Sequence, residues 1–218
     1  MLDHYKTIKE PGFGEFKDRG SKFLAFAAPV FSDTDCHDFL ESVKKLHPKA
    51  RHHCYAFRLG LDGNSFRAND DGEPSGTAGR PILGQIDSFG LTNVMIVVVR
   101  YFGGTLLGTS GLINAYKGAA EICLSNCETV EKIVEAIYRI HFDYAKMSDL
   151  MNALKKLNLE ITGQNFELNP SLDVAIRLGE VAHTLNELKA LVEKIPLEMA
   201  EKMEEIDGLK FEFLRKNA

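Results

Sequence analysis

The 218-residue chain has no tryptophan, few cysteines and no long apolar run, and these shortages exclude several classes of protein. Apolar stretches such as Val94 to Val99 have only the length of a strand, whereas a membrane-spanning helix needs about 18 or more apolar residues. The four cysteines form no Cys-x-x-Cys pair of the kind found in zinc sites. Because no basic and apolar leader follows Met1, we expect a soluble cytoplasmic protein with reduced thiols.

An excess of positive charge is also missing. The net charge is −5, whereas a protein that binds phosphate backbones indiscriminately is basic, so any contact with RNA must be local. Residues 1–127 hold 14 basic and 14 acidic side chains, and residues 128–218 hold 12 and 17, which together give the 26 and 31 of the whole chain. With the polar stretch around Asn126, this change predicts two domains with a boundary after residue 127.

The first domain is predicted to be α+β. Strands are expected at 14–17 and 21–27, joined as a hairpin, and a helix capped near Ser32 follows and stops before Pro48. Alternation over 53–59 and the turn at Asp62-Gly63 predict a second hairpin that ends with 65–68. A short helix from Pro81, a buried strand at 94–99 and a long helix at 112–124 complete this half.

The second domain is predicted to have the order βαββαβ. Its strands are expected at 133–142, 160–168, 172–177 and 209–214, with helices around 150–157 and 181–192. The turn Asn169-Pro170 separates the second and third strands. This order is that of the ferredoxin-like split unit, so we predict a ferredoxin-like domain.

The loop from Asp70 to Gly79 concentrates glycine, carboxylates and hydroxyls, which is typical of a binding loop. Ser75 or Thr77 is expected to cap the next helix and to leave N–H groups for a phosphate or carboxylate. Alternatively, the carboxylates of Asp70, Asp71 and Glu73 bind a hard divalent cation, although their spacing is not that of an EF-hand. The structural alternative is that these residues only form turns.

The second candidate segment, Arg100 to Gly111, follows the most apolar strand and precedes a helix. It lacks the lysine of a Walker A loop and the spacing of a dinucleotide-binding motif. Arg100 either pairs with the acidic loop or binds an anionic partner, and Tyr101 and Phe102 either pack in the core or offer a stacking face.

A cysteine–histidine nucleophile is disfavoured near the start of the strand at 53–59. His52 and His53 are adjacent, so their side chains should point to opposite faces of the strand. Cys54 in turn should face away from His53. The two side chains that such a nucleophile needs are therefore expected to lie apart.

Three motifs resemble those of the IMPACT/YigZ family: Arg51 to Ala56, Asp70 to Leu83, and Val97 to Gly104 with its continuation through Gly111 to Tyr116. The resemblance implies a first domain similar to domain 2 of ribosomal protein S5 and a second similar to domains of elongation factor G. Eukaryotic relatives regulate translation initiation by competing for the activator of a translation-factor kinase. For bacterial-type members the resemblance implies association with nucleic acid or the ribosome.

These observations favour a non-enzymatic factor linked to translation, which binds RNA, the ribosome or a translation protein through the first domain. Two alternatives stay open: an enzyme acting on a phosphorylated or carboxylated small molecule, with or without the help of a metal ion, and a protein-interaction scaffold built on the second domain. We expect no cofactor, no resident metal and no membrane partner. The residues specify neither a substrate nor an oligomeric state.

The expected binding residues share a position where apolar periodicity gives way to glycine and charge. They are His53, Asp70, Asp71, Glu73, Ser75, Thr77, Arg100, Tyr101, Gly103 and Gly104. Local RNA contacts are expected from Lys49, Arg51, Arg67, Arg80 and Arg100. The two segments should meet at one edge of the sheet, with Arg100 paired to an acidic side chain of the loop and His53 nearby.

Overall fold

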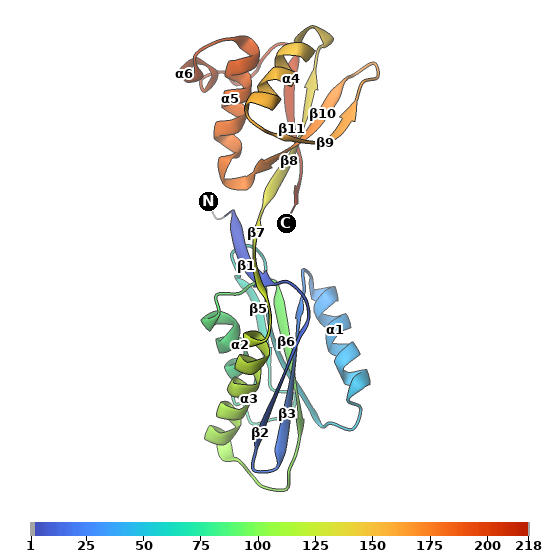
Figure 1. The fold of residues 1–218 in the computed structure, drawn as a ribbon, viewed down its shortest axis with the longest axis vertical. Coiled ribbons are helices and arrows are strands. Elements are labelled where there is room, and N and C mark those ends of the chain that lie inside the picture. Colours follow the sequence, from blue (N-terminus) through green and yellow to red (C-terminus); the bar gives the residue numbers. More distant parts are fainter. Residues whose placement is uncertain (1–2, 218) are drawn as a thin grey trace. The chain divides into compact units, whose positions relative to one another are not determined.

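The computed structural model describes residues 3–217, which form two compact units of mixed α and β structure (Figure 1). The N-terminal unit is His4–Lys132, and the C-terminal unit is residues 133–217 with Asp3. A short strand, β7 (Thr129–Ile133), follows the expected boundary at residue 127 and pairs with β1 (His4–Ile8). This pairing keeps most of β7 with the N-terminal unit, and neither strand was predicted with these bounds.

The N-terminal unit is built on a five-stranded antiparallel sheet in the order β2-β3-β6-β4-β5. Its strands are β2 (Gly12–Asp18), β3 (Ser21–Pro29), β4 (His52–Leu59), β5 (Ser65–Asn69) and β6 (Val94–Tyr101). Both predicted hairpins are present. The turn between β2 and β3 places Arg19 and Gly20 at φ 42° and 79°, the backbone that suits a tight hairpin.

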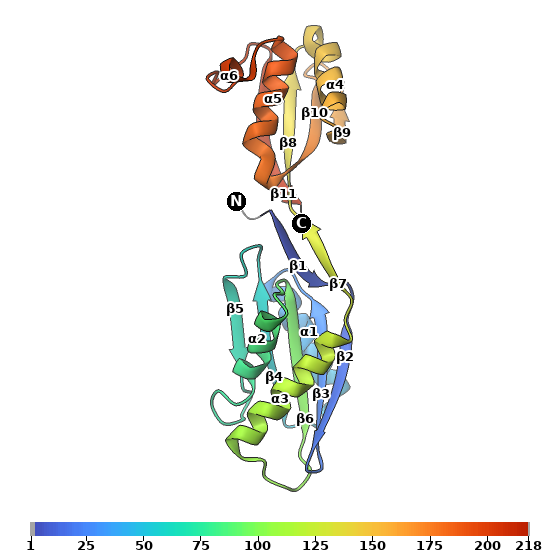
Figure 2. The same ribbon diagram turned by 60° about the vertical axis from the view of Figure 1, so that its left-hand side comes forward.

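Three helices cover this sheet: α1 (Asp33–Leu46) on one face, and α2 (Gly79–Ser88) and α3 (Gly108–Ser125) on the other (Figure 1 and Figure 2). Ser32 caps α1 as predicted, by accepting a hydrogen bond from the N–H of Asp35 at 3.1 Å. The central strand β6 is buried on both faces, because Val98 packs with α2 and α3 while Val99 packs on the α1 side. Two covered faces account for its continuous apolar run.

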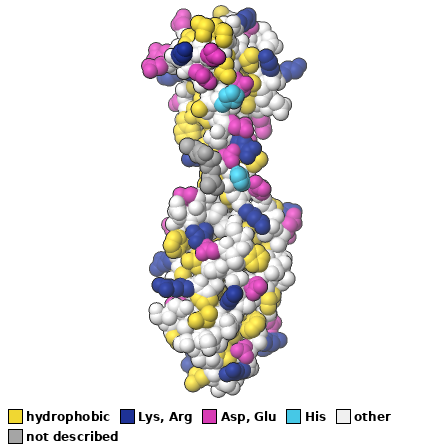
Figure 3. All heavy atoms as spheres, turned by 90° about the vertical axis from the view of Figure 1, so that its left-hand side faces the viewer, with side chains coloured by type: hydrophobic (Ala, Val, Ile, Leu, Met, Phe, Trp, Pro, Cys, Tyr) yellow, Lys and Arg dark blue, Asp and Glu magenta, His cyan; other side chains and the backbone are white. Residues whose placement is uncertain are grey.

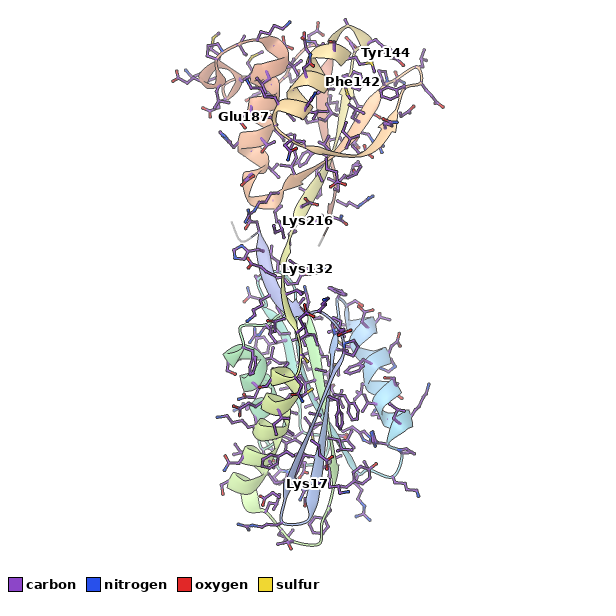
Figure 4. The ribbon with its side chains drawn as sticks, viewed as in Figure 1. Lys17, Lys132, Phe142, Tyr144, Glu187 and Lys216 are labelled. Atoms are coloured by element: carbon purple, nitrogen blue, oxygen red, sulfur yellow. The ribbon has the colours of Figure 1, made fainter. Side chains whose placement is uncertain are left out.

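The C-terminal unit has the predicted order βαββαβ. Its elements are β8 (Glu135–Phe142), α4 (Met147–Lys156), β9 (Glu160–Asn165), β10 (Ser171–Arg177), α5 (Val181–Glu193) and β11 (Leu209–Asn217), with a short α6 (Leu197–Ala200). The antiparallel sheet has the order β11-β8-β10-β9. Its core joins Ile140 of β8 to Leu150 of α4 and Leu188 of α5. Figure 4 labels Phe142 and Tyr144, just where β8 ends.

Within the described part of the chain, no helix is both long and apolar enough to cross a membrane.

Candidate functional site

The two glycine-rich segments meet through one buried ion pair. Nη1 of Arg100, near the end of β6, donates to Oε1 of Glu73 in the acidic loop at 2.7 Å. The side chains of Arg100 and Glu73 are only 8% and 3% exposed. The predicted contact between the loop and the segment from Arg100 is therefore present. The sequence left three possible partners for Arg100, and the structure shows that the partner is Glu73 and not Asp70 or Asp71.

The carboxylate of Glu73 also binds α3. The hydroxyl of Tyr116 donates to the same Oε1 at 2.8 Å, and Sγ of Cys54 lies 3.3 Å from the Tyr116 oxygen. Burial raises the pKa of both Tyr116 and Cys54 above their ordinary values, so both stay protonated at neutral pH. Cys54 is thus a buried thiol that faces away from His53, as the strand alternation predicted, and not an activated nucleophile.

Asp70 caps helix α2, which corrects the expectation that Ser75 or Thr77 would do so. Its carboxylate accepts hydrogen bonds from the N–H groups of Gly76, Ala78 and Gly79 at 2.7, 3.0 and 2.8 Å. Burial raises the pKa of Asp70, but the three N–H groups outweigh burial and hold it below the ordinary value. The N–H groups that we expected to receive a phosphate or carboxylate are thus occupied by a side chain of the protein itself.

Asp71 ties the loop to β4. Asp71 and Gly72 have φ of 41° and 83° in a turn closed by the Glu73 N–H donating to Asp70 O at 2.9 Å. The Asp71 carboxylate accepts the backbone N–H of His53 at 2.6 Å. The His53 ring is buried with its Nε2 3.2 Å from the carbonyl of His47, and burial lowers its pKa. His53 therefore joins the site mainly through its backbone.

The three carboxylates point to different partners. Asp70 binds α2, Asp71 binds β4 and Glu73 binds Arg100, so they do not converge on one point. Among residues 3–217 no group of three or more His, Cys, Asp or Glu side chains is placed to hold a metal ion. The geometry thus does not supply the oxygen cluster that the divalent-cation alternative requires.

The other predicted site residues differ in burial and in the elements that they contact. Ser75 is exposed, whereas Thr77 is buried and its hydroxyl donates to the carbonyl of Pro74 at 2.6 Å. The hydroxyl of Tyr101 lies 3.0 Å from Nδ1 of His47, on the α1 side of the sheet.

Gly103 and Gly104 have structural reasons to be glycine. A Cβ on Gly103 would lie 1.9 Å from the backbone of Gly20 in the β2–β3 turn. Gly104 has φ of +89°, a conformation that side chains disfavour. Both glycines therefore shape the segment that carries Phe102.

A pocket of about 540 Å³ opens where β4 begins and β6 ends. We call it the basic pocket; it is lined by Lys49, Arg51, His52, Arg100, Phe102 and Leu106, with Ala50 and Tyr101. None of these side chains is acidic. Lys49 and Arg51 are exposed and make no ion pair with the described residues, whereas Arg100 is already paired with Glu73 and its Nε is buried. The pocket is therefore suited to an anion.

Positive and negative side chains are mixed on one face of the N-terminal unit. Figure 3 shows Lys and Arg side chains intermixed with Asp and Glu and with hydrophobic side chains over the face in view. This agrees with the expectation that any contact with a polyanion is local.

The sequence did not single out His52, Leu106 or Tyr116 as members of the site. Tyr116 stands among Leu112, Ala115 and Ala119 at helical spacing, the pattern of an ordinary core residue. Nothing in that spacing indicates that its hydroxyl would reach Glu73. Phe102 and Leu106, which the structure leaves 57% and 82% exposed, are large apolar residues in a glycine-rich segment, and that position in the sequence is a signal that could have pointed to Leu106.

The comparisons with known proteins identify the family. The model of the Impact N-terminal domain matches residues 19–124. An IMPACT family member of Haemophilus influenzae is 35% identical over 177 residues, covering 80% of this chain and 86% of that protein. YigZ of Escherichia coli is 35% identical over 164 residues, covering 74% and 80%.

The structural comparison covers both units. A crystal structure of a hypothetical protein has a TM-score of 0.67 and 28% identity, and it covers 99% of each chain. This likeness extends beyond the segment that the Impact N-terminal model matches. Taken with the two relatives, it shows that the chain belongs to the IMPACT family.

Proposed function

We propose that this protein is a non-enzymatic factor linked to translation, which binds RNA, the ribosome or a translation protein through its N-terminal unit. The observation that carries the proposal is the basic pocket, where the exposed Lys49 and Arg51 have no carboxylate in the pocket lining, in a chain of net charge −5. Phosphate groups are the anions that lysine and arginine recognise on RNA. The family resemblance supplies the link to translation.

The expected binding residues take two roles in this proposal. Arg100 and Tyr101 line the basic pocket, whereas Asp70, Asp71 and Glu73 position it by holding the loop against β4, α2 and Arg100. Gly103 and Gly104 shape the backbone next to Phe102. The backbone N–H of His53 holds the loop by donating to the Asp71 carboxylate. Ser75 and Thr77 belong to the same loop and do not line the basic pocket.

A non-enzymatic role is supported by how the reactive side chains are used. Asp70 and Glu73 are already bound within the protein, and Cys54 is a protonated buried thiol. A general base must be able to accept a proton from a substrate, and these groups are not presented to the pocket in that form.

We further propose that residues 1–127 form an S5 domain 2-like domain and residues 128–218 a ferredoxin-like domain similar to those of elongation factor G, in a cytoplasmic protein. Support for the second assignment comes from the order β8-α4-β9-β10-α5-β11 and the sheet order β11-β8-β10-β9. Support for the first comes from the family motifs in the N-terminal unit.

Co-sedimentation with ribosomal particles and binding to ribosomal RNA test the function. The variant is Lys49→Glu with Arg51→Glu, and the matched control is Lys155→Glu with Lys156→Glu on α4, which makes the same change of charge on exposed residues of the C-terminal unit. We expect wild-type binding to weaken as salt rises and to be lost in the pocket variant only. Absence of wild-type binding at low salt, or equal loss in the control, would contradict the proposal.

A further inference from the structure

The side chain of Phe102 lies between two pockets. On one side is the basic pocket, and on the other is a pocket of about 630 Å³ that we call the aromatic pocket. The aromatic pocket is lined by Phe13, Glu15, Gly20, Lys22, Leu24, His47, Tyr101 and Phe102. Tyr101 and Phe102 belong to both linings, so the two pockets adjoin one another.

The ring of Phe102 contacts Arg100 and is still more than half exposed. The guanidinium carbon of Arg100 lies 5.5 Å from the ring centroid of Phe102 and 5.5 Å from that of Phe23. This cation–π contact fixes the ring against a buried side chain. Because 57% of Phe102 stays exposed, the ring can still stack on a flat ligand.

The aromatic pocket has the composition of a base-binding site. Phe13 is 46% exposed and packs beside Phe26, with ring centroids 5.2 Å apart. The one acidic side chain, Glu15, is paired with Lys17 at 2.8 Å, so it adds little repulsion towards a polyanion. Stacking on such rings tolerates any base but requires that the base be unpaired.

We infer that the two pockets together bind a single-stranded RNA segment, with a phosphate in the basic pocket and the neighbouring base stacked on Phe102 towards Phe13. This rests on the proposed function and narrows its ligand from RNA in general to an unpaired strand. The exposed amino and guanidinium groups of Lys49 and Arg51, which make no ion pair with the described residues, supply the phosphate contacts. The exposed ring next to them supplies the base contact.

Fluorescence anisotropy with the full chain tests this, using a labelled 12-nucleotide RNA and the same RNA annealed to its complement. We expect the single strand to bind more tightly than the duplex. Phe102→Ala should raise the Kd for the single strand by about fivefold or more, since one base stack is lost. Phe102→Trp should retain binding.

The matched control for the ring is Phe66→Ala. Phe66 is also 57% exposed and also lies under an arginine, Arg58, at 5.0 Å, but it stands on β5 outside both pockets. For the phosphate contact, Lys49→Ala should lower the salt slope of single-strand binding by about 0.7, and Lys156→Ala should not.

The inference is overturned if the duplex binds as tightly as the single strand, or if Phe66→Ala weakens binding as much as Phe102→Ala does. Retained binding of ribosomal particles by Phe102→Ala, with no single-strand binding by the wild type, overturns the inference and leaves the proposed function standing. Failure of every RNA and ribosome sample to bind overturns both.

Discussion

Arg100–Glu73 in the N-terminal unit and Arg139–Asp173 in the C-terminal unit are both arginine–carboxylate pairs between separate segments, and they differ in burial. Arg100 and Glu73 are 8% and 3% exposed, while Arg139 of β8 and Asp173 of β10 are 40% and 19% exposed. The second pair is bidentate, with distances of 2.7 and 2.9 Å across directly opposed strand positions. Its geometry is therefore at least as good as that of the first.

Burial decides what each pair contributes. Water screens the exposed pair and hydrates either partner when the other is removed, so such pairs contribute about 0–1 kcal/mol. A buried charge that loses its partner is left without hydration, which costs about 3–5 kcal/mol. We therefore expect the same kind of substitution to have very different effects in the two units.

The largest effect is expected for Glu73→Ala. It leaves the guanidinium of Arg100 buried without its hydrogen bond to Oε1 of Glu73, and it also removes the acceptor of the Tyr116 hydroxyl. We expect the free energy of unfolding to fall by about 3–5 kcal/mol, measured by urea denaturation. The double variant Glu73→Leu with Arg100→Met, which removes both charges, should recover part of the loss. A loss below about 1 kcal/mol in the single variant would contradict our account of burial.

A smaller effect is expected for Asp70→Ala, because the Asp70 carboxylate satisfies N–H groups at the start of α2 that water can partly replace. We expect a loss of about 1–2 kcal/mol at neutral pH. The folded-state pKa of Asp70 is below its ordinary value, so its contribution is complete above that ordinary value and is lost as the pH falls through the folded-state pKa. Denaturation curves from pH 7 to pH 3 should show the wild type and the variant converge. Ser75→Ala is the control on the same loop and should change little.

The next smaller effect is expected for Asp173→Ala in the exposed pair. The loss in unfolding free energy should be about 1 kcal/mol or less, and it should shrink further as salt is added. Hydrogen bonding and charge from Arg139 lower the pKa of Asp173, so the contribution again disappears on acidification. A loss as large as that of Glu73→Ala would break the comparison between the two pairs.

The smallest effect is expected from protonation of His53. Burial lowers the pKa of this histidine, so the unfolded chain takes up its proton at a higher pH than the folded chain does. The contribution of His53 to the free energy of unfolding is therefore fully present above the unfolded-state pKa, and it is lost as the pH falls towards the folded-state pKa. Replacing His53 with Gln should flatten this part of the stability profile, as followed by thermal unfolding from pH 7.5 to pH 5. An unchanged slope in the His53→Gln variant would contradict this prediction.

The sequence by itself determined most of the secondary structure. The caps, turns and periodicity predicted both hairpins, the helix capped by Ser32 and the order βαββαβ, because each of these signals acts between residues close in the chain. It also determined that Arg100 needs an acidic partner, since a lone charge at the end of a buried strand is costly. The short pairing of β1 with β7 was missed because its two strands lie far apart in the chain.

Only the tertiary structure decided which partner each carboxylate of the loop binds. Asp70, Asp71 and Glu73 are close together in one loop of the sequence. In the fold, Asp70 accepts hydrogen bonds from the start of α2, Asp71 from β4 and Glu73 from Arg100. The positive φ values at Asp71 and Gly72 turn the chain between them, and this reversal has no counterpart in the periodicity of the residues. The Tyr116 hydroxyl reaches Glu73 only because α3 packs on the same sheet face as Arg100. Contacts between distant segments depend on packing, which local sequence patterns do not encode.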